Sequence, residues 1–240
     1  MSGLRVKGLS YAYGATQALD DVGFEIEEGA FTALLGPNGA GKSTLFALLT
    51  RLIATPSGEI EIAGVDLSKR PGAALAALGV VFQQPTLDLD LTVRQNLSYF
   101  LALHGIAGRE AARRMDAALE TLSMAERAGE KVRALNGGHR RRAEIARALS
   151  HDPKVLLLDE PTVGLDAASR AAITGEVHAL ARERGVTVLW ATHLTDEIED
   201  KDRLLVLHRG RLLADTTGAI FRGEASLSDA FLAATGEGAA

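Results

Sequence analysis

The residues from Gly36 to Thr44 have types and a spacing suited to holding a chain of phosphates. Glycine has no Cβ and tolerates positive φ, so successive backbone N–H groups can wrap closely around an anion. In this G-x-x-x-x-G-K-[ST] pattern the Lys42 ammonium can reach the β- and γ-phosphates, and the Ser43 hydroxyl can ligate Mg²⁺. The predicted nucleotide-binding residues are Gly36, Pro37, Asn38, Gly39, Ala40, Gly41, Lys42, Ser43 and Thr44.

A pair of carboxylates, Asp159 and Glu160, follows the apolar run Val155–Leu158. In open α/β sheets, ligands bind at the carboxyl ends of the strands. We therefore expect Asp159 to hold Mg²⁺ opposite Ser43, and Glu160 to polarise the attacking water. Two carboxylates can also do no more than cap the end of a strand, but the phosphate loop in the same chain favours the catalytic interpretation.

The elements that position these residues follow from the pattern of apolar residues. Phe31–Leu35 is a short apolar run of strand type, and Leu45–Leu52 has helical spacing, so the phosphates would meet a helix N-terminus. Val155–Asp159 is a continuous apolar run, which is typical of a buried parallel strand. The other predicted strands are Leu4–Leu9, Ala18–Ile26, Glu59–Ile62, Gly79–Phe82, Val186–Ala191, Arg203–His208 and Arg211–Ala214.

Between residues 91 and 150 helical spacing replaces the strand-type runs. The helices predicted there are Val93–His104, Glu110–Ser123 and Arg140–Ser150. This pattern predicts a single domain, residues 1–240, in which a helical lobe (87–151) is inserted into an α/β core (1–86 and 152–240). A last helix is predicted at Leu227–Ala234, and residues 236–240 are expected to be disordered.

The composition of the chain excludes several classes of protein. Its 240 residues are 47% apolar and 24% charged, as in a globular domain, and the net charge of −5 argues against a general nucleic-acid binder. The absence of cysteine excludes disulfides and cysteine-ligated metals. The N-terminus has no signal-peptide pattern and no uncharged apolar run reaches 18 residues, so we expect a cytoplasmic protein.

The phosphate loop and the carboxylate pair belong to a longer series of motifs. In chain order these are the phosphate loop, Gln83, Leu135-Asn136-Gly137-Gly138-His139, Asp159-Glu160, Gly164-Leu165-Asp166 and His193. This series resembles the ATP-binding subunit of an ABC transporter, from about Tyr13 to about Gly236. The resemblance implies an α/β fold: a P-loop NTPase core with a mixed, mostly parallel sheet, an antiparallel β subdomain and an inserted α-helical lobe.

The resemblance also implies roles for single residues. Tyr13 matches the aromatic residue that stacks on adenine, and Gln83 matches the glutamine that reaches Mg²⁺ and the attacking water. Gln84 competes for that role, but Gln83 follows its strand immediately. Asp166 matches the loop that crosses the dimer interface, and His193 matches the histidine that touches the γ-phosphate. The implied catalytic residues are Glu160, His193 and Gln83, and the implied metal ligands are Ser43, Gln83 and Asp159.

The segment Leu135–His139 departs from the family's usual Leu-Ser-Gly-Gly-Gln signature. Gly137 and Gly138, which let backbone amides approach a phosphate, are retained. Asn136 replaces serine and keeps a hydrogen-bond donor, and His139 replaces glutamine. We expect ATP binding to be unchanged by these two replacements. They bear instead on how strongly the dimer forms and on how fast it turns over ATP. The following Arg140–Arg142 forms either a solvated helix face or a support for the partner's nucleotide.

The family implies ATP and Mg²⁺ as ligands and an ATP-dependent homodimer, or a heterodimer with a second ATPase subunit. It implies separate integral membrane permease subunits that dock around residues 84–96, a position on the cytoplasmic face of the membrane, and no nucleic-acid partner. Residues 226–236 resemble the tail of ATPases serving ABC-2-type exporters. Residues 79–97 and 135–149 resemble ATPases found with quinone-dependent alcohol dehydrogenase systems. Export is favoured over import.

Two alternatives are open on the sequence. A soluble ABC ATPase acting on ribosomes or in DNA repair usually carries a second cassette, a coiled coil or a basic arm, and none is visible here. A plain P-loop kinase or GTPase leaves no role for Asn136-Gly137-Gly138 and His193.

Overall fold

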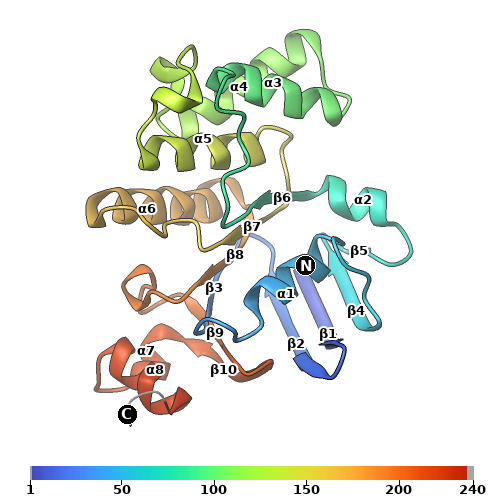
Figure 1. Cartoon of the computed structure of the whole chain (residues 1–240), viewed down its shortest axis with the longest axis vertical. Helices are drawn as coiled ribbons and strands as arrows, with labels where there is room; N and C mark the ends of the chain where they lie inside the picture. Colours follow the sequence, from blue (N-terminus) through green and yellow to red (C-terminus); the bar gives the residue numbers. More distant parts are fainter. Residues whose placement is uncertain (1, 237–240) are drawn as a thin grey trace.

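A six-stranded sheet forms the centre of the fold in the computed structural model, which describes residues 2–236 (Figure 1). Its strand order is β10-β9-β3-β8-β7-β6; β10 pairs antiparallel with β9, and the other pairings are parallel. The α/β class and the mostly parallel sheet predicted from the sequence are confirmed. The strands are β3 (Phe31–Leu35), β6 (Leu78–Val81), β7 (Val155–Asp159), β8 (Thr187–Thr192), β9 (Arg203–His208) and β10 (Arg211–Thr217).

A second sheet of four antiparallel strands has the order β2-β1-β4-β5. The helix α1 (Lys42–Leu49) lies between the two sheets, and one hydrophobic cluster joins it to both of them. The phosphate loop therefore leads into a helix whose apolar side chains are fully buried. The strands of this sheet are β1 (Ser2–Tyr13), β2 (Thr16–Glu27), β4 (Ser57–Ile62) and β5 (Val65–Asp66).

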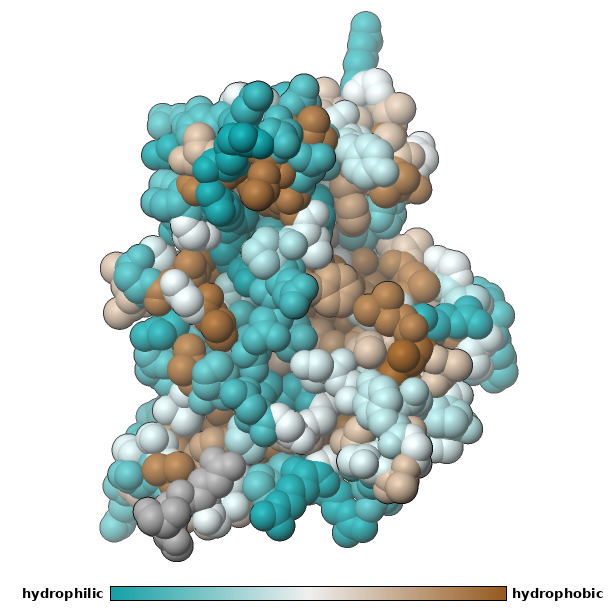
Figure 2. Space-filling model, viewed as in Figure 1, coloured by the Kyte–Doolittle hydropathy of each residue, from teal (hydrophilic) through white to brown (hydrophobic). Residues whose placement is uncertain are grey.

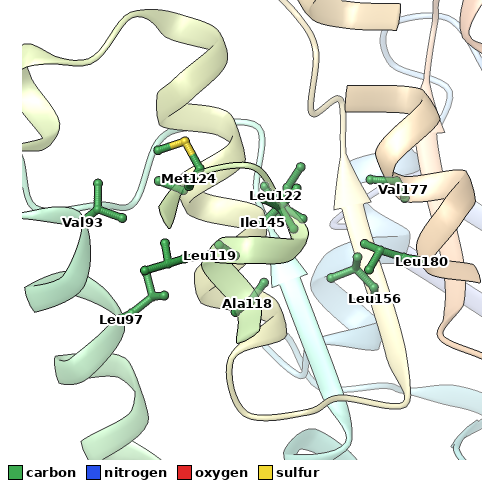
Figure 3. Close-up of a cluster of buried hydrophobic side chains, with 14 of the residues drawn as sticks. Val93, Leu97, Ala118, Leu119, Leu122, Met124, Ile145, Leu156, Val177 and Leu180 are labelled. Atoms are coloured by element: carbon green, nitrogen blue, oxygen red, sulfur yellow. The ribbon is translucent and has the colours of Figure 1, made fainter. Parts of the chain in front are cut away.

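A helical layer covers the other face of the large sheet (Figure 1). Its main helices are α3 (Val93–Leu103), α4 (Gly108–Thr121), α5 (Gly137–Leu149) and α6 (Ala167–Arg184), with short 3₁₀ turns at η1 (Ala125–Arg127) and η2 (Val132–Ala134). Figure 3 shows Val93 and Leu97 of α3 facing Leu119 of α4, and Leu156 of β7 facing Leu180 of α6. One cluster thus runs from α3 to the sheet, and the boundary of the lobe at residues 87 and 151 stays a prediction.

The remaining elements are α2 (Pro71–Ala76), η3 (Thr195–Glu197), α7 (Gly218–Arg222) and α8 (Leu227–Thr235). Within residues 2–236, no helix is both long enough and apolar enough to cross a bilayer. The disorder expected for 236–240 concerns residues that, beyond Gly236, lie outside the described part of the chain.

Three predicted helices begin earlier than their apolar patterns do. α1 begins at Lys42 instead of residue 45, α4 at Gly108 instead of 110, and α5 at Gly137 instead of 140. In each case the first turn consists of small or polar residues, so the apolar spacing starts only after the backbone is already helical.

The helices α2, α6 and α7 have no counterpart among the predicted elements. In α6 the buried face mixes apolar Ile173, Val177 and Leu180 with polar Thr174 and His178. This mixture hides the helical period from a search for apolar stripes.

His178 is buried between α6 and the turn that precedes β9. Its Nε2 lies 2.9 Å from Asp202 Oδ2, its Nδ1 lies 2.9 Å from the carbonyl oxygen of Thr174, and its ring stacks on Phe31. Both ring nitrogens face acceptors, and only the imidazolium can donate to both. Burial lowers the pKa of His178, but the hydrogen bond and charge of Asp202 outweigh burial and raise its pKa overall.

The raised pKa of His178 predicts a pH-dependent stability. The pair with Asp202 contributes fully below about pH 6.5, the ordinary pKa of histidine, and its contribution is lost as the pH rises through the raised pKa. The difference in free energy of unfolding between wild type and His178→Gln should therefore shrink from pH 6 to pH 9, by about 1.4 kcal/mol for each unit of elevation. Urea denaturation at both pH values measures it, and an unchanged difference would contradict the charged pair.

Candidate active site

The loop between β3 and α1 packs too closely against neighbouring backbone to admit side chains at two of its positions. A Cβ on Gly41, where φ is 111°, would lie 2.6 Å from the carbonyl oxygen of Ala18, and a Cβ on Gly36 would lie 2.5 Å from that of Leu207. Only glycine fits these two positions. The helix α1 has no side-chain cap and no acidic residue in its first turn. Its N-terminus therefore offers free N–H groups and a positive dipole end to an anion.

Lys42, in the first turn of α1, is buried with only 5% of its surface exposed. Its Nζ donates to the carbonyl oxygens of Gly36 (2.6 Å) and Pro37 (3.2 Å) and lies 3.2 Å from Glu160 Oε1. The ammonium is thus held over the loop that is expected to bind the phosphates, beside the carboxylate at the end of β7.

Glu160 is the residue on which the predicted catalytic groups converge. Its side chain accepts a hydrogen bond from Gln83 Nε2 (3.1 Å), and Nδ1 of His193 lies 3.3 Å from its Oε1. The His193 contact has the distance of an ion pair but not the geometry of a hydrogen bond, and within residues 2–236 Nδ1 has no hydrogen-bond partner. Three segments far apart in the chain therefore meet at one carboxylate.

The backbone at Glu160 is strained. Its φ is 47°, a backbone conformation that residues with a Cβ rarely adopt. Its N–H donates to the carbonyl oxygen of Ala191. Strain of this kind persists where the surrounding structure overdetermines the conformation, and it is common at functional sites. Here it accompanies the turn that places the Glu160 carboxylate beside Lys42, Gln83 and His193.

Asp159, the last residue of β7, is also buried. Burial, and then the neighbouring charge of Glu160, raise the pKa of Asp159 to about 6, against the opposing charges of Lys42 and Arg141. The Ser43 hydroxyl, the Asp159 carboxylate and the amide oxygen of Gln83 are all oxygen donors, the type that Mg²⁺ prefers. The donor set therefore fits this metal, and its assignment stays a prediction.

The segment Asn136–His139 forms the start of α5. Asn136 caps the helix, with its Oδ1 accepting from the N–H of His139 at 2.8 Å. Gly138 is buried, and a Cβ there would lie 3.1 Å from Ser169 Oγ. Ser169 in turn donates to Asp166, which caps α6. The predicted signature and the predicted interface loop therefore lie together.

The two segments whose glycines are predicted to bind phosphate are separate in a single chain. Within residues 2–236, no hydrogen bond or ion pair joins the phosphate loop to Asn136–His139. α1 lies on one face of the large sheet, whereas α5 lies in the helical layer on the other face (Figure 1). Each chain thus carries two predicted half-sites, the phosphate loop and Asn136–His139, which do not meet within it.

Tyr13 ends β1, and its ring is 53% exposed and packs edge-on against Tyr11 at 4.9 Å. The hairpin that carries it also brings Ala18 beside Gly41. Its role in stacking on adenine stays a prediction. Gln83 and Gln84 are both exposed, but in the described chain only Gln83 of the two has a side-chain hydrogen bond, which favours Gln83.

The sequence predicted that Arg140–Arg142 forms either a solvated helix face or a support for the partner's nucleotide. For Arg141 both predictions are wrong. It is 7% exposed, and its guanidinium pairs with Glu144 and donates to the carbonyl oxygens of Phe82 and Gln83. The spacing of three between Arg141 and Glu144 was the available sequence signal.

Comparison with known proteins decides the family. The family described as ABC transporter matches residues 19–163, more than half of the chain. The chain belongs to the ABC transporter family. It is an ATP-binding subunit and an ATPase of that family, as the sequence predicts.

Two relatives and one solved structure illustrate the similarity. The chain is 37% identical over 222 residues to "Daunorubicin resistance ATP-binding protein DrrA3" of Streptomyces coeruleorubidus, covering 92% of this chain and 70% of the relative. It is 35% identical to "Linearmycin resistance ATP-binding protein LnrL" of Bacillus subtilis, covering 88% and 68%. An ABC cassette solved as a post-hydrolysis dimer with ADP and Pi has a TM-score of 0.77 and 28% identity, over 89% of this chain and 98% of that one.

Proposed function

We propose that this ABC ATPase is the motor subunit that energises export through a separate membrane subunit. The observation that carries the catalytic part is the convergence of Lys42, Gln83 and His193 on Glu160. The names of the two relatives, which refer to resistance to daunorubicin and to linearmycin, favour export over import.

The chemistry proposed is transfer of the γ-phosphoryl group of ATP to water. Glu160 orients and polarises the water, Gln83 holds the Glu160 carboxylate and the water in register, and His193 contacts the γ-phosphate. Lys42 places a positive charge where negative charge develops on the phosphates, which is the main source of catalysis in this reaction class. Ser43, Asp159 and Gln83 would hold Mg²⁺, which would further neutralise that charge.

Two copies are proposed to pack head to tail, so that each ATP lies between one phosphate loop and the partner's Asn136–Gly138. The separation of the two half-sites on opposite faces of the large sheet supports this arrangement, and Asp166 lies where it would border the interface. The dimer is a homodimer or a heterodimer with a second ATPase subunit.

The proposed surface for the membrane subunit lies over residues 84–96 and α3. Leu89, Tyr99 and Leu103 are 46%, 65% and 68% exposed there, and Figure 2 shows hydrophobic residues among the hydrophilic ones over this part of the helical layer. A cluster of exposed apolar side chains is typical of a protein contact. Docking there would place the chain on the cytoplasmic face of the membrane.

Capture from detergent-solubilised membranes of the native host tests the proposal. The tagged wild-type chain should retain an integral membrane permease, and Leu103→Glu should lose most of it, because a charge at the centre of the contact must be desolvated. Ile220→Glu, at an exposed apolar residue of α7 far along the chain, is the matched control and should retain the permease. Capture of a ribosomal or DNA-repair partner instead would contradict the transporter role.

A further inference from the structure

Three charged residues of α5 face the segment that carries Gln83. Arg141, Glu144 and Arg147 are spaced by three, which places them along one side of the helix. Arg141 Nη1 lies 2.7 Å from Glu144 Oε2, and both side chains are almost completely buried. A charged row in this position is unexpected, because burying an ion pair removes both charges from water.

These residues bind the backbone on both sides of Gln83. Arg141 donates to the carbonyl oxygens of Phe82 (2.9 Å) and Gln83 (3.1 Å). The N–H of Thr86 donates to Glu144 Oε1 (2.7 Å). Arg147 donates to the carbonyl oxygen of Thr86 and to its hydroxyl (2.6 Å). The segment 82–86 is therefore fastened to α5 by its main chain, while the side chain of Gln83 reaches Glu160.

The arrangement connects the two half-sites of one chain. Asn136 caps α5, and Arg141 lies five residues further along the same helix, roughly 7.5 Å away. A helix transmits a small shift of its N-terminus over this distance as a rigid body. A shift at Asn136–Gly138 would therefore move the carbonyl of Gln83 and, with it, the side chain that touches Glu160.

We propose that Arg141, paired with Glu144, is a positioning residue. It holds Gln83 in contact with Glu160 and moves Gln83 when the N-terminus of α5 moves. This rests on the proposed function, in which that N-terminus binds the ATP held by the partner. In this arrangement, ATP bound by the partner at the α5 N-terminus of one chain changes the contact between Gln83 and Glu160 in that same chain. Burying the pair contributes to this geometry more than to stability, since buried ion pairs are often replaceable by apolar residues without loss of stability.

The test removes both charges together and asks whether Gln83 is needed for the effect. Arg141→Met with Glu144→Leu leaves no unpaired buried charge, so the protein is expected to fold and bind ATP as before. We expect kcat to fall by about tenfold or more with little change in KM, because small misplacements of catalytic groups are costly. In a Gln83→Ala background the same double change should have no further effect on kcat.

Several outcomes would overturn the proposal. These are an equal loss in both backgrounds, an unchanged kcat in the folded apolar pair, or a Gln83→Ala variant as active as wild type. Arg114→Met is the matched control. Arg114 also donates to a backbone carbonyl, but to that of His151 and not to the segment of Gln83, so the kcat of this variant should not change. If the apolar pair does not fold, Arg141→Lys replaces it: it keeps a charge for Glu144 but loses the planar guanidinium, whose two terminal nitrogens donate to the carbonyls of Phe82 and Gln83. Its partial loss of kcat should likewise vanish without Gln83. Glu160→Gln in the same assay reveals separately whether the proposed function fails.

Discussion

Replacement of Glu160 by glutamine is expected to lower ATP turnover by about 10²–10⁴-fold, the range attributed to general acid–base groups. Glutamine keeps the shape of the side chain and can still contact Gln83 and His193, but it cannot polarise water. ATP binding should survive, because the phosphate loop and Lys42 are untouched. Single-turnover hydrolysis and calorimetric ATP binding measure the two quantities separately.

Glu110→Gln is the control for this prediction, because it removes an exposed carboxylate on α4 whose ion pairs, within residues 2–236, are with Arg113 and Arg114. Its turnover should equal that of the wild type. An unchanged rate of single-turnover hydrolysis in Glu160→Gln would show that Glu160 is not the catalytic group, and the water would then have to be activated by another residue of the site.

Gly138→Asp is expected to reduce turnover by about 10²-fold, comparable to removal of a stabilising donor from a transition state. The new carboxylate would face the phosphates of the ATP held by the partner and repel them. The isolated chain should tolerate the charge, since acidic residues are favourable near a helix N-terminus. ATP binding to the single chain should be unchanged.

Gly138→Ala separates charge from size. It adds the same Cβ, which would lie 3.1 Å from Ser169 Oγ, without a carboxylate. We expect Gly138→Ala to lose much less turnover than Gly138→Asp. Equal losses would mean that crowding against α6 causes the effect, and the charge argument would be wrong.

The sequence was most informative where the structure is determined locally. The glycines, lysine and serine of residues 36–44 define a loop between a strand and a helix, and Val155–Asp159 is a strand with the predicted bounds. These segments depend on spacing and on continuous apolar runs, which are properties of neighbouring residues. The carboxylate pair predicted the role of Glu160, and the family resemblance supplied those of Gln83 and His193. The proximity of the three residues depends on β6, β7 and β8, which are far apart in the sequence but adjacent in the sheet.

Other features depended on tertiary contacts that no local pattern contains. Arg141 lies in a run of three arginines, and only the packing of α5 against the segment after β6 shows that it is buried while Arg140 and Arg142 are not. The helix α6 was not predicted because His178 occupies its buried face, and that position is tolerable only with Asp202 beside it. Burial of a polar residue is decided by its partner, not by its own sequence neighbourhood.

The central claim is that the hydrolytic site is assembled from two chains, and the molecular mass of the slow-hydrolysing variant tests it most directly. Size-exclusion chromatography with light scattering of Glu160→Gln in ATP should give a dimer, and the same protein without nucleotide should be smaller. Glu160→Gln combined with Gly138→Asp should remain a monomer in ATP. If both variants form equally stable dimers in ATP, the segment Asn136–His139 does not bind the partner's nucleotide, and the two-chain site is contradicted.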